Sequence, residues 1–150
     1  MAQQPAIRFR QAAVDDLAAI LAIQDQAAAA PWSGRQWRDS LESHSVTLLD
    51  VNGTVAGYAV VASVLDEREL LNIAVMPAQQ GQGLGGILLD RCLAKDGTGA
   101  VRMLLEVRSG NQSAIALYRS RGFVKAGIRK GYYPAGAGRE DAWVMVYEFQ

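Results

Sequence analysis

Cysteine and histidine are nearly absent from this chain. Its 150 residues include one cysteine, Cys92, and one histidine, His44. A single cysteine cannot form an internal disulfide, and Cys92 lies on the apolar stripe of a predicted helix, which favours a buried, inert thiol in a reducing cytoplasm. His44 lies in a polar bend before a predicted strand, as expected for a surface histidine. The sequence therefore shows no metal-ligand set, and we expect no metal.

Excess charge of one sign and long apolar runs are also lacking. Fifteen basic residues balance fifteen acidic residues without a long block of either sign, so neither direct nucleic acid binding nor membrane binding is expected. No apolar run has the length to cross a bilayer, and the first ten residues lack the apolar centre of a signal peptide. Half of the residues are hydrophobic, which suits one buried core, and we expect a single domain over residues 1–150.

The spacing of apolar residues predicts one mixed α/β sheet with flanking helices. The expected strands are 7–11, 46–51, 54–65, 69–75, 101–107, 123–132 and 142–149. The expected helices are 15–29, 34–43, 83–94 and 111–121. Ser33 and Gln36 have capping-box spacing before the second helix, which is expected to bury Trp37 and Leu41. Asn52-Gly53 suits a type I′ hairpin turn.

The most informative segment is a glycine-rich loop between a predicted strand and a predicted helix. It reads Gln80-Gly81-Gln82-Gly83-Leu84-Gly85. Glycines let the backbone approach a ligand, and the free N–H groups of a helix start attract phosphate, so the loop suggests a diphosphate ligand. The same glycines could instead serve only a tight turn. The loop lacks the Gly-Lys-Ser/Thr ending of a P-loop and an acidic residue placed for a ribose, which disfavours ordinary nucleotide folds.

A second motif follows, and the two motifs together resemble a known family. The second motif reads Glu106-Val107-Arg108-x-x-Asn111-x-x-Ala114-x-x-Leu117-Tyr118-x-x-x-Gly122-Phe123. With Gln80-x-x-Gly83-x-Gly85 it resembles the acetyl-CoA signature of the GNAT superfamily of N-acetyltransferases. Further segments resemble the RimI-type ribosomal-protein alanine N-acetyltransferases, and they are Pro31-Trp32-Ser33, Leu65-Asp66-Glu67, Asn72-Ile73-Ala74-Val75, Tyr132-Tyr133-Pro134 and Gly138-Arg139-Glu140-Asp141-Ala142.

The resemblance implies a GNAT fold that binds acetyl-CoA. In that fold a mixed, mostly antiparallel sheet splays its two central parallel strands to admit the pantetheine arm. The residues implied to bind acetyl-CoA are Ile73, Ala74, Val75, Gln80, Gly81, Gln82, Gly83, Leu84, Gly85, Gly86, Asn111 and Tyr118. Three positions depart from the family pattern. Gly81 replaces a common Arg, Gly86 replaces a larger residue and Ala13 replaces a capping Thr or Ser, so the diphosphate is expected to be held mainly by backbone.

Acetyl transfer to an amine needs a base and a proton donor for the departing thiolate. By resemblance, Glu106 is the candidate base, acting through water, and Tyr118 is the candidate acid. The alternatives are a solvated or Arg108-paired carboxylate for Glu106 and an amphipathic tyrosine covering the core for Tyr118. Asn111 is also a candidate N-cap of the helix that carries Tyr118, which is compatible with a cofactor contact.

The amine acceptor can be considered by the cost of removing its proton. Freeing an α-amine at pH 7 costs ~1 kcal/mol, whereas freeing a lysine costs ~4–5 kcal/mol. Desolvation can lower the pKa of a lysine, so both acceptors stay open on this argument. The RimI-type resemblance implies the N-terminal alanine of small-subunit ribosomal protein number eighteen, with other protein N-termini as further acceptors. The implied peptide-binding residues are Trp32, Asp66, Glu67, Tyr132 and Tyr133.

Several alternatives remain open at this point. Trp32 could be a core residue of a helix corner, and Asp66-Glu67 a solvated loop. The protein could also be a broader N-terminal or lysine acetyltransferase, or a non-catalytic acyl-CoA-binding module. A cytoplasmic protein is expected, with a monomer favoured.

Overall fold

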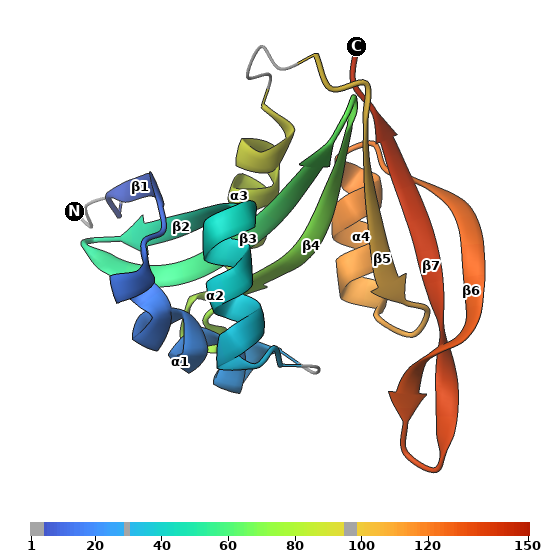
Figure 1. The fold of residues 1–150 in the computed structure, drawn as a ribbon, viewed down its shortest axis with the longest axis horizontal. Coiled ribbons are helices and arrows are strands. Elements are labelled where there is room, and N and C mark those ends of the chain that lie inside the picture. The colour runs from blue at the N-terminus through green and yellow to red at the C-terminus, as the bar shows by residue number, and fades with distance from the viewer. Residues whose placement is uncertain (1–4, 29–30, 95–98) are drawn as a thin grey trace. The chain divides into compact units, whose positions relative to one another are not determined.

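The computed structural model describes residues 5–28, 31–94 and 99–150. Its strands form a seven-stranded sheet in the order β1-β2-β3-β4-β5-β7-β6 (Figure 1). The chain divides into two compact units, one of Met1–Ala62 with Asn72–Cys92 and the other of Ser63–Leu71 with Leu93–Gln150. Strands β3 and β4 contribute residues to both units. The expectation of one domain over the whole chain stays a prediction.

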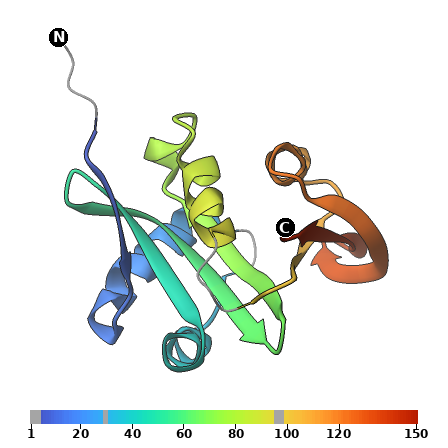
Figure 2. The ribbon, with the colours of Figure 1, turned by 90° about the horizontal axis from the view of Figure 1, so that it is seen from above.

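The first unit contains the N-terminal strands and three of the helices. Its elements are β1 (Ile7–Gln11), α1 (Leu17–Ala27), α2 (Gly34–Ser43), β2 (Ser45–Val51), β3 (Thr54–Val64), the end of β4 (Glu67–Val75) and α3 (Leu84–Leu93). Strands β1, β2 and β3 pair in antiparallel fashion. Helices α1 and α2 cover one face of these strands and α3 covers the other (Figure 2). The predicted hairpin is confirmed, because Asn52 and Gly53 both have positive φ, 52° and 83°.

The first helix begins two residues later than the predicted range 15–29. Val14–Asp16 form a 3₁₀ turn, α1 begins at Leu17, and residue 29 lies outside the described ranges. Ala13 has no capping side chain, but the Asp16 carboxylate accepts the Ala13 N–H at 2.8 Å. The same carboxylate binds the Arg10 guanidinium through two hydrogen bonds of 2.9 and 3.0 Å, which lowers the pKa of Asp16. Asp16 thus satisfies the N–H of the N-cap residue, which is the half of a capping box that does not depend on a side chain at Ala13.

One buried polar side chain fixes the corner between α1 and α2. Gln24 is 2% exposed. Its amide nitrogen donates to the Trp32 carbonyl at 2.7 Å, and its oxygen accepts the Trp32 N–H at 2.9 Å and the Trp37 indole N–H at 3.0 Å. The Trp37 ring lies 4.9 Å from Trp32 and 4.8 Å from Tyr58. The capping box of α2 and the burial of Trp37 are confirmed, whereas Leu41 is half-buried.

Replacing Gln24 by alanine is expected to lower the free energy of unfolding by about 2–3 kcal/mol. The substitution leaves the Trp32 and Trp37 donors buried without their acceptor, and an unsatisfied buried group costs about 1–3 kcal/mol. Urea unfolding followed by tryptophan fluorescence measures the change. Gln112→Ala, at an exposed position in α4 (Gln112–Ser120), is the control and should change stability by less than about 0.5 kcal/mol. Equal effects of the two substitutions would contradict the role given to Gln24.

The second unit combines β5 (Arg102–Arg108), α4, β6 (Val124–Ala135), β7 (Gly138–Glu148) and the start of β4. Strand β4 pairs with β5 in parallel from Glu67–Arg102 to Leu70–Leu105, and β7 pairs in antiparallel fashion with both β5 and β6. Helix α4 covers one face of these strands (Figure 2). The side chains buried in this unit include Met103, Leu105, Val107, Ile115, Tyr118, Phe123 and Met145. The sheet is therefore mixed and mostly antiparallel, as predicted.

The last two strands are longer than predicted. The expected strands were 123–132 and 142–149, but β6 continues to Ala135 and β7 begins at Gly138. Two residues of β6, Gly131 and Pro134, are of types that usually end a strand, so the sequence pattern did not predict the extension. Gly131 has a φ of 58° and lies in an irregular part of the β6–β7 ladder, and Pro134 is tolerated because β6 is the edge strand of the sheet.

Candidate active site

The glycine-rich loop of the first unit has the backbone geometry that a phosphate-binding loop requires. Gly81 and Gly83 have φ values of 82° and 75°. A Cβ at either position would meet nothing within 4 Å, so these glycines are needed for conformation and leave open space beside the backbone. The Gln80 amide donates to the Val75 carbonyl at 3.0 Å, which ties the loop to the end of β4.

Helix α3 begins directly after this loop. It starts at Leu84, and the Ile87 N–H donates to the Gly83 carbonyl at 3.1 Å. The N–H groups of the first turn of a helix have no partner within the helix and can bind an anion. Gly85 and Gly86 lie in this first turn, and the buried Gly86 leaves no side chain there. The residues present therefore fit a diphosphate held by backbone amides.

The end of β4 carries the other predicted cofactor residues of the first unit. Ile73 and Ala74 are half-buried and Val75 is buried. A Cβ at Gly57 of β3 would lie 2.9 Å from the Ala74 carbonyl. The two backbones therefore approach closely, and only glycine fits at position 57 without a shift.

Glu106 occupies a distinct position in β5 of the second unit. It is the first residue beyond the parallel ladder, which ends at Leu70–Leu105. Its side chain is 20% exposed and lies 3.0 Å from the Arg129 guanidinium of β6. The Tyr132 hydroxyl donates to the Glu106 carboxylate, and this hydrogen bond is the main cause of the raised pKa of Tyr132. The Glu106 carboxylate therefore has two partners from β6, the guanidinium of Arg129 and the hydroxyl of Tyr132.

The alternative pairing of Glu106 with Arg108 is wrong. Arg108 instead contacts Glu140 at 3.2 Å and donates to the Pro134 carbonyl at 3.0 Å. Its guanidinium also lies 4.4 Å from the centre of the Tyr133 ring. The two charged residues belong to separate ion pairs because each is matched to a different position of the β6–β7 hairpin.

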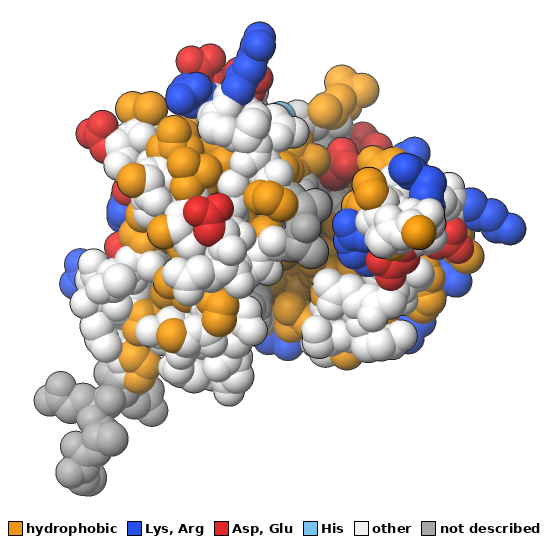
Figure 3. All heavy atoms as spheres, turned by 90° about the horizontal axis from the view of Figure 1, so that it is seen from below, with side chains coloured by type: hydrophobic (Ala, Val, Ile, Leu, Met, Phe, Trp, Pro, Cys, Tyr) orange, Lys and Arg blue, Asp and Glu red, His pale blue; other side chains and the backbone are white. Residues whose placement is uncertain are grey.

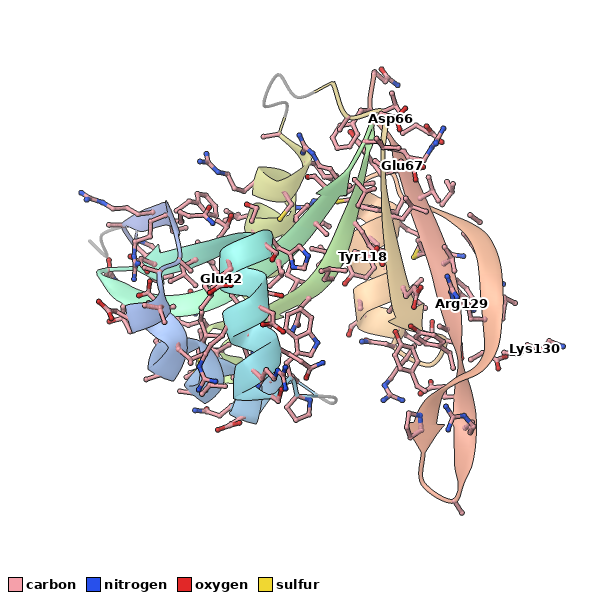
Figure 4. The ribbon with its side chains drawn as sticks, in the orientation of Figure 1. Glu42, Asp66, Glu67, Tyr118, Arg129 and Lys130 are labelled. Atoms are coloured by element: carbon pink, nitrogen blue, oxygen red, sulfur yellow. The ribbon has the colours of Figure 1, made fainter. Side chains whose placement is uncertain are left out.

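Tyr118 lies in α4 and is 7% exposed. Its ring centre is 5.8 Å from that of Phe123. Asn111 caps the helix by accepting the Ala114 N–H at 3.2 Å, which confirms the predicted N-cap. Side chains alternate along β5, where Leu105 and Val107 are buried, so Glu106 points to the face opposite to these two residues. Figure 4 shows Tyr118 on its helix behind the strands.

Four of the predicted peptide-binding residues belong to the second unit, where they lie in two places, and the fifth belongs to the first unit. Tyr132 and Tyr133 contact each other, with ring centres 5.0 Å apart, and Tyr132 reaches Glu106. Asp66 and Glu67 lie at the other end of this unit (Figure 4). Glu67 pairs with Arg102 at 2.8 Å, four residues before Glu106 on β5, which is roughly 13 Å along the strand. Trp32 belongs to the first unit and is half-buried.

Comparison with known proteins decides the family. A model described as "Acetyltransferase (GNAT) family" matches residues 12–123, which is more than half of the chain. The chain belongs to the GNAT acetyltransferase family. It is 43% identical to the [ribosomal protein bS18]-alanine N-acetyltransferase of Escherichia coli K12 over 132 residues, covering 87% of this chain and 89% of that protein.

Solved structures support the same assignment. The crystal structure of the ribosomal-protein-S18-alanine N-acetyltransferase from Escherichia coli matches with a TM-score of 0.88 and 40% identity, covering 95% of this chain and 94% of that one. The yncA protein of Salmonella typhimurium, solved with its cofactor acetyl-CoA, matches with a TM-score of 0.79 and 27% identity over 97% and 95% of the two chains. The predicted fold and acetyl-CoA as co-substrate of this GNAT enzyme are confirmed.

Two charged residues near Tyr132 had no predicted role in this GNAT protein. Arg129 contacts Glu106, and Glu69 is close enough to contribute to the raised pKa of Tyr132. Nothing in the local sequence around Arg129 distinguishes it from Lys130. A half-buried carboxylate such as Glu106 needs a cationic partner, and this need is the one indication of a residue like Arg129. Which cation fills that role depends on strand register, which the local sequence does not give.

The distribution of charged side chains on the surface of the GNAT protein agrees with its equal numbers of basic and acidic residues. On the face shown in Figure 3, acidic and basic side chains are interspersed among hydrophobic ones. Within the described ranges, no group of three or more potential metal-ligating side chains comes together. No helix among the described residues combines the length and apolarity needed to span a membrane.

The substitution Gly83→Ala is expected to raise the Kd for acetyl-CoA roughly tenfold. A residue with a Cβ is strained at positive φ by about 1–2 kcal/mol, and relief of that strain turns the loop N–H groups away from the diphosphate. Isothermal titration calorimetry measures the affinity. Gly53→Ala is a matched control because Gly53 also has positive φ and open space around its Cβ position. The control should leave the Kd unchanged, and equal affinities of both variants would argue against this loop as the diphosphate site.

Proposed function

We propose that this protein transfers the acetyl group of acetyl-CoA to the N-terminal alanine of ribosomal protein bS18. The observation that carries the proposal is the 43% identity to the Escherichia coli enzyme of that name over 87% of the chain. The placement of Glu106 and Tyr132 supports it, because a carboxylate and a phenol are available to receive an ammonium group. A ribosomal-protein substrate places the reaction in the cytoplasm.

The proposed mechanism assigns the two proton transfers to two residues. Acetyl-CoA supplies the thioester, and the backbone N–H groups of residues 80–86 hold its diphosphate. Glu106 removes a proton from the α-ammonium through a water molecule, which leaves a neutral amine to attack the thioester carbonyl. As the C–S bond breaks, the Tyr118 hydroxyl donates its proton to the departing thiolate, and the second proton that the amine nitrogen loses on forming the amide is released to solvent, from which Tyr118 is reprotonated.

The proposed peptide contacts differ in how well the geometry supports them. Tyr132 and Tyr133 lie beside Glu106 and Arg108, so they are the best supported contacts for an acceptor N-terminus. Asp66, Glu67 and Trp32 remain proposed contacts of the substrate. We also propose a single GNAT domain over residues 1–150, since the family match extends across both units, and a monomer.

Mass spectrometry of acetylated peptides tests this function. A peptide with the free N-terminal alanine of bS18 is compared, in the presence of acetyl-CoA, with an N-terminally blocked peptide that contains lysine. Acetylation of the α-amine alone is the expected result. Acetylation of lysine alone would assign the protein to the lysine acetyltransferases. Acetyl-CoA binding without turnover on either peptide would overturn the proposed substrate and favour another acceptor or a binding module.

A further inference from the structure

The β6–β7 hairpin contains a bulge beside Glu106. The register pairs Arg129 with Ala142 and then Tyr133 with Glu140. Four steps along β6 therefore match two steps along β7, so β6 carries two extra residues in this stretch. A bulge leaves backbone groups without ladder partners and redirects nearby side chains.

Two β7 side chains bind the backbone of this bulge. The Asp141 carboxylate accepts the Gly131 N–H at 2.9 Å. The Arg139 guanidinium donates to two successive carbonyls, that of Gly131 at 2.5 Å and that of Tyr132 at 3.1 Å. These contacts replace the missing ladder hydrogen bonds with charge-assisted ones, which are stronger than neutral ones. We call Arg139, Asp141 and their contacts to Gly131 and Tyr132 the bulge clamp.

The bulge places Tyr132 on the same side as Arg129. In an uninterrupted strand, residues three positions apart point to opposite faces of the sheet. Arg129 and Tyr132 are three positions apart, yet both contact the Glu106 carboxylate, Arg129 at 3.0 Å and Tyr132 through its hydroxyl. Figure 4 shows Arg129 over the strands and Lys130 projecting away from the hairpin. The irregular backbone therefore brings both side chains to one carboxylate.

We propose that Arg139 and Asp141 are positioning residues, which act through the bulge to hold Tyr132 and Arg129 against Glu106. They do not contact Glu106 themselves. Their importance for turnover rests on the proposed function, in which Glu106 is the base and Tyr132 borders the acceptor amine. Arg139 and Asp141 belong to the Gly138-Arg139-Glu140-Asp141-Ala142 segment, and the clamp gives these two residues a role in shaping the site of the acceptor amine.

Steady-state kinetics of Asp141 variants test the proposal. Asp141→Ala removes the acceptor for the Gly131 N–H and should lower kcat/KM for the acceptor roughly tenfold, the loss expected for a charge-assisted hydrogen bond. The Kd for acetyl-CoA should stay unchanged. Asp141→Asn keeps an acceptor oxygen and should retain most of the activity. Glu148→Gln is the control, because it removes a 3.6 Å ion pair with Arg102 from the other end of the same strand.

A double-mutant cycle separates positioning from general destabilisation. In a Tyr132→Phe background, Asp141→Ala should cost clearly less than in the wild-type enzyme, because the group that it positions has lost its hydroxyl. Independent, multiplicative losses in the cycle would overturn the proposal, as would an Asp141→Asn variant as impaired as Asp141→Ala.

A structural readout makes the result independent of the acceptor. The Arg129 Nε–H resonance is followed by ¹⁵N NMR, with Glu106→Gln defining its position when the ion pair is broken. Asp141→Ala should shift the resonance toward that position, while Glu148→Gln should not. An unchanged resonance in Asp141→Ala would overturn the clamp even if the enzyme acts on bS18. A shifted resonance in an enzyme that does not acetylate the bS18 peptide would reject the proposed substrate and keep the clamp.

Discussion

Replacing Glu106 by glutamine is expected to lower kcat for acetylation of the α-amine by roughly 10²–10⁴-fold, the usual contribution of a general base. Glutamine keeps the size of the side chain and can accept a hydrogen bond from Tyr132, but it cannot take up a proton. Arg129 is 57% exposed, so loss of its ion pair should change the free energy of unfolding by less than about 1 kcal/mol. Stopped assays with the free N-terminal peptide measure kcat.

The Glu106 result can be separated from a general effect of charge removal. Glu148→Gln removes a carboxylate from the same unit, at a position with no proposed contact to substrate, and should leave kcat unchanged. Thermal unfolding of both variants checks that the fold is retained. A Glu106→Gln enzyme with wild-type kcat would show that Glu106 only forms its contacts with Arg129 and Tyr132 and that the amine loses its proton by another route.

Replacing Tyr118 by phenylalanine is expected to slow the chemical step roughly 10²-fold, at the lower end of acid–base contributions. The substitution removes only the phenolic hydroxyl and keeps the ring that packs against Phe123, so the Kd for acetyl-CoA should remain nearly unchanged. Single-turnover experiments with excess enzyme measure the chemical step directly. Unchanged single-turnover chemistry would exclude Tyr118 as the acid for the departing thiolate.

Tyr147→Phe is the matched control for Tyr118. Both tyrosine rings contact Phe123, with ring centres 5.8 Å away for Tyr118 and 5.5 Å away for Tyr147. Loss of the Tyr147 hydroxyl should therefore reproduce any packing effect without an effect on chemistry. A comparable loss of rate in both variants would indicate that the Tyr118 hydroxyl acts through packing of the unit.

Local sequence signals predicted most of the secondary structure. The capping box of Ser33 and Gln36, the N-cap Asn111 and the Asn52-Gly53 turn each depend on neighbours within a few residues, and all three are confirmed. The start of α1 and the length of the last hairpin were predicted less well. In the first case a 3₁₀ turn over Val14–Asp16 precedes α1. In the second case Gly131 and Pro134, which are typical of strand ends, lie within an irregular edge strand.

The candidate site was only partly predictable, because several of its contacts join residues that are far apart in the sequence. The glycine spacing and the position of Glu106 in an apolar strand are visible in the sequence, and the family resemblance gave them meaning. The alternative that paired Glu106 with Arg108 was wrong, because Arg108 is close in sequence whereas Arg129 is close in space. Asp66 and Glu67 were grouped with Tyr132 by resemblance, but strand register places Glu67 of β4 beside Arg102, which lies four residues before Glu106 on β5. Their part in substrate binding stays a prediction.

The sequence by itself determined the order of strands and helices, the glycine loop that needs positive φ, and the carboxylate and phenol available for proton transfer. These features depend on residue type and short spacing, which a linear chain displays directly. Only the tertiary structure decided which charges meet. Arg129, Tyr132 and Glu106 come together because two extra residues in β6 redirect side chains from a regular alternation, and Arg139 and Asp141 bind the backbone that this irregularity leaves unpaired.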